Sequence, residues 1–398
     1  MRTQQLLLPS TFEKGVITSL LAHLFLSISN IHIHFKVLQI VKPELLFFVS
    51  SFSFAGIWFC MVRQLPISIT KGYGALFLVI SFFMLIDFQY PANESSNLLA
   101  LGEFKTYTKT ILLIPLFTFF FNNQQRKDLL IKVFRVSAVV LGMVFIYRYL
   151  VLGEVRTFDL RPVIGIRIGD PNFLSMIFLI TLFIGPLRQK AVAPVTIFES
   201  LFLILCLFMT QSRMGIIGLF IGLIALFGKK ITEKPVLLVL FILLIISPIF
   251  LSEDLQSRFL NIFDKSNMDR FKTWELGLIL FSKNPIWGVG FDRSAGYFFQ
   301  LTGYPMFLSQ NGALTIHNTP LKLLAETGVI GITIFLYAFK QIFIQLRQTS
   351  REFLLPFFLF IFCIQFIGIW NKDFFLFTIL IFTIVSLKNR SLLEFSKS

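Results

Sequence analysis

The sequence predicts an all-α polytopic membrane protein with about 12 transmembrane helices. Of its 398 residues, 56% are hydrophobic, 16% aromatic and only 14% charged, whereas a soluble domain is nearer to half apolar and a quarter charged. Apolar stretches long enough to cross a bilayer core of about 30 Å recur along the chain. A single long polar loop, residues 252–317, separates the ninth and tenth of them.

The apolar stretches divide the chain into three parts. The predicted spans are 15–31, 45–62, 73–90, 107–121, 134–152, 172–187, 195–210, 214–228, 235–251, 327–345, 353–369 and 373–387. The first lacks a small-residue cleavage site and further spans follow it, so we expect an anchor and not a removed signal peptide. Residues 1–251 then hold spans 1–9, residues 252–326 form a loop with amphipathic helices, and residues 327–398 hold spans 10–12 and a tail.

Basic residues set the predicted orientation, because cytoplasmic loops carry an excess of lysine and arginine. With a cytoplasmic N-terminus every inward segment is basic. The residues concerned are Arg2, Lys14, Arg63, Lys71, Arg126, Lys127, Lys132, Arg188, Lys190, Lys229, Lys230, Lys234, Lys340, Arg347, Arg351, Lys388, Arg390 and Lys397. Twelve spans return the C-terminus to the cytoplasm and place the long loop outside. The net charge of +15 therefore follows from membrane topology, and we expect a bilayer and no nucleic acid as partner.

Two outward segments, 153–170 and 252–293, stay rich in arginine against this rule. Basic residues that topology does not require suggest an anionic ligand. A metal site is not expected, since Cys60, Cys206 and Cys363 fall inside apolar spans and the histidine pair at 32 and 34 has no evident third ligand.

Within the loop, residues 268–281 place Phe271, Trp274, Leu278 and Phe281 at helical spacing. This pattern predicts an amphipathic helix that lies on the membrane or caps the spans. Asn284-Pro285 should end it, because proline disfavours helix at the preceding residue. A turn at Gly288-Val-Gly290 is expected to follow.

The end of the loop predicts a short helix of two turns. Thr319 suits the N-cap, Pro320 the first helical position and Gly328 the C-cap. His317 then stands just before a helix N-terminus. The positive end of the helix dipole disfavours an imidazolium there, so we expect a neutral ring that can accept a proton.

Four motifs, in order along the chain, resemble signatures of the bacterial O-antigen ligase and O-antigen polymerase superfamily. They are Gly169-Asp170-Pro171-Asn172, Gln211-Ser212-Arg213-Met214-Gly215, Asp269-Arg270-Phe271…Trp274…Asn284-Pro285-Ile286-Trp287-Gly288-Val289-Gly290, and His317-Asn318…Leu321…Leu324-Ala325-Glu326-Thr327-Gly328-Val329-Ile330-Gly331. The resemblance covers about residues 160–335, whereas the first half matches in hydropathy alone.

The resemblance implies a glycosyltransferase of the GT-C type in the bacterial inner membrane, with both termini cytoplasmic and the large loop periplasmic. Such proteins move a glycan from an undecaprenyl-pyrophosphate carrier to an acceptor hydroxyl, with no metal ion and no cofactor. Ligases of lipopolysaccharide biosynthesis use the lipid A core as acceptor, and polymerases use the growing glycan. The resemblance also implies functional roles for Arg213, Arg270 and His317.

These residue types fit the chemistry. Arginine is permanently charged and binds phosphate oxygens bidentately, so it stabilises a departing pyrophosphate. Our hypothesis is that His317 is the general base for the acceptor hydroxyl, while Arg213, Arg270 and Arg167 hold the pyrophosphate. Secondary candidates for sugar, carrier or orienting contacts are Arg156, Arg161, Asp170, Asn318 and Glu326.

Other interpretations stay open. His317 could be a capping or loop histidine, Arg213 could snorkel from the start of its span, and Arg270 could solvate the polar edge of its helix. The motifs favour a ligase but leave a polymerase possible. A small-solute transporter would show repeated halves and ionisable groups at the bilayer midplane, which are not evident in the sequence.

Overall fold

The computed structural model describes residues 2–29, 43–62, 112–150, 171–185, 194–233, 265–290, 293–294, 297, 316–368 and 373–387. These residues form helices joined by turns, and no strand occurs among them. The all-α class is therefore confirmed for this part of the chain.

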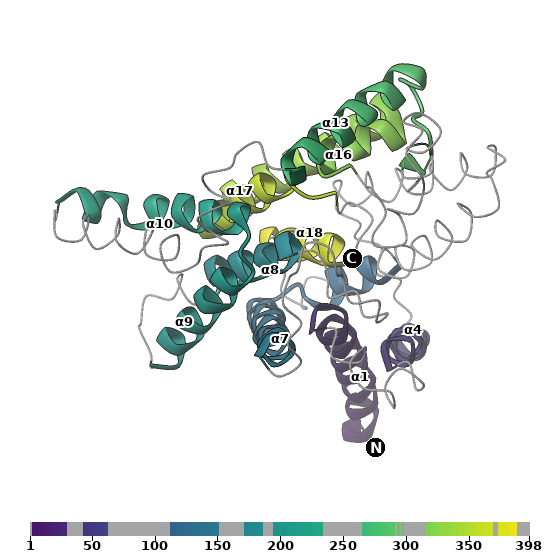
Figure 1. The fold of residues 1–398 in the computed structure, drawn as a ribbon. Coiled ribbons are helices and arrows are strands. Elements are labelled where there is room, and N and C mark those ends of the chain that lie inside the picture. Colours follow the sequence, from purple (N-terminus) through teal and green to yellow (C-terminus); the bar gives the residue numbers. More distant parts are fainter. Residues whose placement is uncertain are drawn as a thin grey trace. The chain divides into compact units, whose positions relative to one another are not determined.

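The helices bear the labels of Figure 1. They are α1 (Arg2–Ser29), α4 (Pro43–Val62), α7 (Gln124–Leu150), α8 (Pro171–Ile184), α9 (Pro194–Met209), α10 (Arg213–Glu233), α13 (Lys265–Lys283), α16 (Thr319–Thr349), the 3-10 turn η2 (Arg351–Phe353), α17 (Leu354–Cys363) and α18 (Asp373–Ser386). A further helical segment covers 112–120.

Three described segments are long and apolar enough to cross a membrane: Ser10–Ser29, Gln124–Leu150 and Thr319–Thr349. Several of the other described helices are apolar but shorter. The predicted spans 73–90 and 235–251 lie outside the described residues. The number of twelve spans, their orientation and the proposed division into domains stay predictions.

Two predicted boundaries were wrong. The span expected at 134–152 belongs to α7, which already begins at Gln124 because the Oδ1 atom of Asn123 accepts the Arg126 amide proton at 2.9 Å. The cluster that includes Arg126 is thus helical and not a loop. The span expected at 353–369 is shorter, because α17 ends at Cys363 and a turn follows.

By their contacts, the residues form two compact units. The first comprises Met1–Tyr147, Thr333–Phe353 and Trp370–Ser398, and the second comprises Arg148–Ile332 and Leu354–Ile369.

Within the first unit, α1 packs on α4 and on α18. The His23 ring of α1 lies 5.9 Å from the Phe377 ring of α18, and Lys127 of α7 donates to the Leu387 carbonyl at the end of α18. Lysine at a helix C-terminus satisfies an otherwise unpaired carbonyl.

In the second unit, small residues of α10 let α8 approach closely. A Cβ atom added at Gly215 would lie 2.6 Å from the Ser175 Cβ atom, and one at Gly218 would lie 2.6 Å from Leu179 Cδ2. Glycine is common where membrane helices pack backbone against backbone. The two helices run in the same direction, since the residue numbers of both contacting pairs increase together.

Candidate functional site

The helix α13 (Lys265–Lys283) occurs where the sequence predicted an amphipathic helix, and a face other than the predicted apolar stripe packs against the protein. Leu276 and Leu280 are 2% and 1% exposed, whereas Phe271 and Leu278 of the predicted stripe are 51% and 56% exposed. The buried face is set by a close contact, because a Cβ atom at Gly277 would come within 2.9 Å of Leu321 Cγ on α16. The helix therefore packs on the start of α16 with the face next to the predicted stripe.

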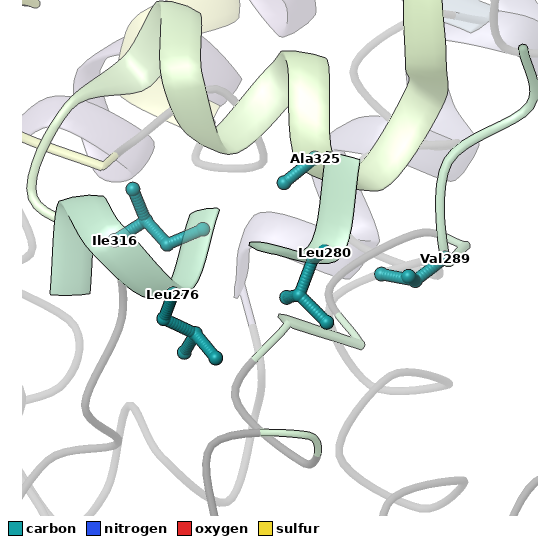
Figure 2. Close-up of a cluster of buried hydrophobic side chains, with 5 residues drawn as sticks. All are labelled: Leu276, Leu280, Val289, Ile316 and Ala325. Atoms are coloured by element: carbon teal, nitrogen blue, oxygen red, sulfur yellow. The ribbon is translucent and has the colours of Figure 1, made fainter. Parts of the chain in front are cut away.

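The core of this contact is a small apolar cluster. Figure 2 shows its side chains: Leu276 and Leu280 from α13, Val289 from the turn after α13, Ile316 before α16, and Ala325 within α16. The cluster joins two motifs that are about 40 residues apart in the sequence. It carries Ile316, the neighbour of His317, at 0% exposure.

Gly328 breaks α16, as the sequence predicted. Its φ of 64° and ψ of −166° interrupt the helix, and a helical residue beyond the break can no longer bond to the carbonyl four positions earlier. The bonds lost are those from the amides of Val329 and Ile330 to the carbonyls of Ala325 and Glu326.

The turn after α13 replaces these bonds one for one. The amides of Val289 and Gly290 donate to the Ala325 and Glu326 carbonyls, each at 3.0 Å. In return the carbonyls of Pro285 and Ile286 accept from Val329 at 2.8 Å and Ile330 at 3.5 Å. Buried backbone groups need such partners. The loop motif and the α16 motif are therefore two halves of one interlocked backbone structure. We call this backbone pairing of residues 285–290 with residues 325–330 the splice.

Gly288 and Gly328 make the splice possible. Both have positive φ, of 71° and 64°. A Cβ atom at Gly288 would overlap the backbone of Glu326 and Thr327, and one at Gly328 would overlap the backbone of Ile286 and Trp287. Only glycine combines this conformation with so close an approach of two chains.

The sequence predicted Thr319 as the N-cap of α16, but the N-cap is Asn318. The Asn318 Oδ1 atom accepts the Leu321 amide proton at 2.8 Å, and its carbonyl accepts from Lys322 at 2.8 Å. Pro320 thus occupies the second helical position. The prediction failed because both residue types cap well and the choice depends on tertiary contacts.

Those contacts tie the start of α16 to the turn that follows α17. Asn318 Nδ2 donates to the Gln365 carbonyl at 3.0 Å. The amide of Thr319 donates to the Ile364 carbonyl at 2.8 Å, and its hydroxyl donates to the Ile367 carbonyl. The side chains of the two residues that follow His317 are thereby held by one turn.

His317 lies immediately before this cap, and its side chain is partly buried. Its carbonyl accepts a hydrogen bond from Trp274 Nε1 of α13 at 3.3 Å. The histidine backbone is therefore fixed from two directions, by α13 on one side and by the turn after α17 on the other. A general base needs such positioning, since proton transfer requires hydrogen-bond reach to the substrate.

Arg270 lies on α13 one turn before Trp274, so both residues project from the same face of the helix. Its side chain is partly buried, and its carbonyl accepts from the Thr273 hydroxyl at 2.8 Å. Since Trp274 bonds to His317, the predicted arginine and the predicted histidine stand on neighbouring elements.

Arg213 is the first residue of α10, at the positive end of the helix dipole. Its neighbour Ser212 is the N-cap, with Oγ accepting from the Gly215 amide at 3.3 Å and donating to Asn172 Oδ1 at 2.7 Å. The Asp-Pro-Asn and Ser-Arg-x-Gly motifs are thus joined by a buried hydrogen bond. The positive end of the helix dipole does not favour a cation at this position.

The helix α10 approaches α17 near the C-terminal end of α17. A Cβ atom at Gly218 would lie 3.6 Å from the Phe362 ring, near the C-terminal end of α17. The Phe362 and Phe366 rings are 5.2 Å apart, and residues 364–367 hold Asn318 and Thr319. The contacts therefore connect α10, through the end of α17 and the turn that follows it, to the residues after His317.

Glu326 belongs to a buried polar cluster. Its Oε1 atom accepts from the Ser294 hydroxyl at 2.6 Å and lies 3.9 Å from Lys322 Nζ. The side chains of Glu326 and Lys322 are 0% and 3% exposed. A carboxylate buried so completely needs these partners. This arrangement supports a structural role at the splice and does not place Glu326 at a solvent-accessible position.

Four predicted site residues, Arg156, Arg161, Arg167 and Asp170, lie outside the described residues. Among the described residues no group of three or more His, Cys, Asp and Glu side chains could hold a metal ion. The sequence analysis missed Trp274 as a partner of His317, and it missed the Gln365 turn. A polar glutamine and a Gly368 near the end of an otherwise apolar span were the available signal for that turn.

The tether between Asn318 and Gln365 gives a testable prediction. Asn318→Asp keeps the oxygen that caps α16 but replaces the donor to the Gln365 carbonyl by a second acceptor. Because small misplacements of reacting groups are costly, we expect a fall of about 10-fold or more in turnover, with α16 still folded. Rates at saturating donor, together with thermal unfolding in detergent, measure this.

Asn123→Asp is the matched control, since Asn123 caps α7 in the first unit by the same bond. It should leave turnover unchanged. Equal activity of wild type and Asn318→Asp would show that the tether does not position the site.

Residues 199–336 match the O-antigen ligase family. The match runs from α9 into α16 and includes the Ser212–Gly215 motif, α13, the splice and His317. It excludes Asn172 and the Gln365 turn, which contact matched residues. No curated protein matches the chain.

Proposed function

We propose that the protein is a ligase-type glycosyltransferase of the O-antigen ligase and polymerase superfamily, because residues 199–336 match the O-antigen ligase family. It moves a glycan from undecaprenyl pyrophosphate to an acceptor hydroxyl, the lipid A core, on the periplasmic face of the inner membrane. The observation that carries this proposal is the convergence on His317, whose backbone α13 and the turn after α17 hold beside a helix N-terminus.

In this mechanism His317 takes the proton of the acceptor hydroxyl as that oxygen attacks the anomeric carbon of the donor glycan. The bond from the anomeric carbon to the pyrophosphate oxygen breaks, and undecaprenyl pyrophosphate leaves. A base placed in this way contributes about 10²–10⁴-fold in rate.

Arg270 and Arg213 bind the oxygens of the leaving pyrophosphate, whose charge grows as the bond breaks. Guanidinium groups supply this stabilisation without proton exchange, and arginines fixed before the reaction have no reorganisation to undergo. Arg167 is proposed for the same role, with Arg156, Arg161 and Asp170 as further contacts. Asn318 acts through the position of His317 and not on the substrate.

A polymerase of the same superfamily is the second candidate. It would use the same donor and the same residues, with the growing glycan as acceptor. The chemistry at His317 is identical for the two acceptors, so the two candidates differ in the acceptor molecule that the site binds.

A deletion strain of the source organism separates the candidates, with surface glycans analysed by gel after complementation. Loss of all long-chain material from lipid A core, with full-length glycan accumulating on undecaprenyl pyrophosphate, identifies a ligase. A core that carries one repeat unit and no ladder identifies a polymerase. An unchanged ladder in the deletion strain would contradict both the ligase and the polymerase and would favour a small-solute transporter.

A further inference from the structure

The helix α13 has an exposed apolar flank that its contact with α16 leaves uncovered. Leu276 and Leu280 face α16, as described above. Phe271 and Leu278 lie on a different flank at 51% and 56% exposure, and the partly buried Trp274 extends this flank toward α16.

The other exposed flank of α13 is charged. Lys272 and Lys283 are both exposed, and at 100° per residue they project on the side of the helix away from Phe271 and Leu278. One edge of the exposed surface is thus apolar and the other edge is basic, with exposed Ser282 and Glu275 between them. This is the division typical of a helix that lies in the plane of a membrane interface.

The splice fixes the level of this surface relative to a membrane-crossing helix. Ile286 and Trp287 follow α13 and are 55% and 43% exposed. The Ile286 carbonyl bonds to Ile330 and the Pro285 carbonyl to Val329, and these residues begin the apolar part of α16, one of the segments long enough to span a membrane. Exposed apolar side chains, one of them a tryptophan, therefore lie beside the start of that apolar segment, and tryptophan is enriched where membrane helices meet the interface.

We propose that the apolar flank of α13, formed by Phe271 and Leu278 together with Ile286 and Trp287, is a lipid-binding surface. It rests in the acyl boundary of the leaflet at which α16 begins, with Lys272 and Lys283 directed to the headgroups and water. Lipid is the occupant because the splice holds the surface at the membrane entry of α16 and because the basic flank matches anionic headgroups. This inference goes beyond the proposed function. If that function holds, the surface also keeps Arg270 and His317 at the headgroup level, where a lipid-linked pyrophosphate lies.

Spin labelling of the full chain tests the proposal. Cys60, Cys206 and Cys363 are first replaced by alanine. Single cysteines at 271, 278, 272 and 283 then carry a nitroxide in proteoliposomes of phosphatidylethanolamine and phosphatidylglycerol. We expect labels at 271 and 278 to collide mainly with oxygen, which concentrates in lipid, and labels at 272 and 283 mainly with a water-soluble nickel chelate. Equal ratios at the four positions, or labels at 271 and 278 closed to both reagents, would overturn the proposal.

Tryptophan quenching tests it without the cysteine replacements. The difference between wild type and Trp287→Phe isolates the fluorescence of Trp287, which brominated lipid should quench several-fold more strongly than aqueous acrylamide does. The reverse order would overturn the proposal. Neither readout depends on glycan transfer, so failure of this inference is distinguishable from failure of the proposed function.

Discussion

His317→Ala is expected to abolish measurable glycan transfer while leaving the fold intact. Loss of a general base lowers the rate by about 10²–10⁴-fold. Trp274 donates to the His317 carbonyl, a backbone atom that alanine keeps, and neighbouring Asn318 supplies the cap. The initial rate of transfer by equal amounts of purified protein in proteoliposomes measures the effect.

His317→Gln keeps a polar side chain of similar size and serves as the matched variant. It should be as inactive as His317→Ala, because an amide cannot accept the hydroxyl proton. Both variants should unfold at the temperature of the wild type in detergent. Near-normal transfer by either one, at matched protein level, would remove His317 from the reaction.

Gly328→Ala is expected to destabilise the site more than any other single-methyl change that we consider. The φ and ψ of Gly328 fall in a region that is essentially restricted to glycine and costs about 1–3 kcal/mol for other residues. The added methyl group would also overlap the backbone of Ile286 and Trp287. That backbone cannot move without loss of the bonds from Val329 and Ile330. We expect a clear drop in the thermal unfolding temperature, or no folded protein, by size-exclusion chromatography in detergent.

Gly56→Ala is the matched control, since Gly56 lies in α4 and a Cβ atom there meets no atom within 4 Å. Alanine is favoured over glycine in a helix by about 1 kcal/mol, so this variant should be at least as stable as the wild type. If Gly328→Ala unfolds at the same temperature as Gly56→Ala, the backbone pairing of the splice does not require glycine at position 328.

Features that depend on local chemistry could be predicted from the sequence. The end of α13 at Lys283 follows from Asn284-Pro285, and the break at Gly328 follows from a glycine after a periodic apolar segment. Which face of α13 is buried could not be predicted, because Leu276 and Leu280 repeat at helical spacing just as Phe271 and Leu278 do. A distant contact decides between them, as Gly277 packs on Leu321.

In the candidate site, too, local features could be predicted from the sequence, whereas features that depend on distant contacts could not. The motif around His317 pointed to a residue just before a helix, and that position is where the structure has it. The cap was assigned to Thr319 because local preference does not separate it from Asn318. Hydrogen bonds to a turn 47 and 48 residues further along the chain, at Gln365 and Ile367, decide their roles. No local pattern in the sequence carries such a pairing.

Transfer by the purified protein is the most direct test of the central claim. Wild type and His317→Ala are reconstituted with the undecaprenyl-pyrophosphate-linked glycan and the lipid A core of the source strain, in the presence of EDTA, and the released undecaprenyl pyrophosphate is quantified. For the wild type we expect release of undecaprenyl pyrophosphate in an amount that matches the glycan transferred to the core. For His317→Ala we expect no released carrier and no transferred glycan. Folded wild-type protein that releases no carrier, or equal release by both proteins, would contradict it.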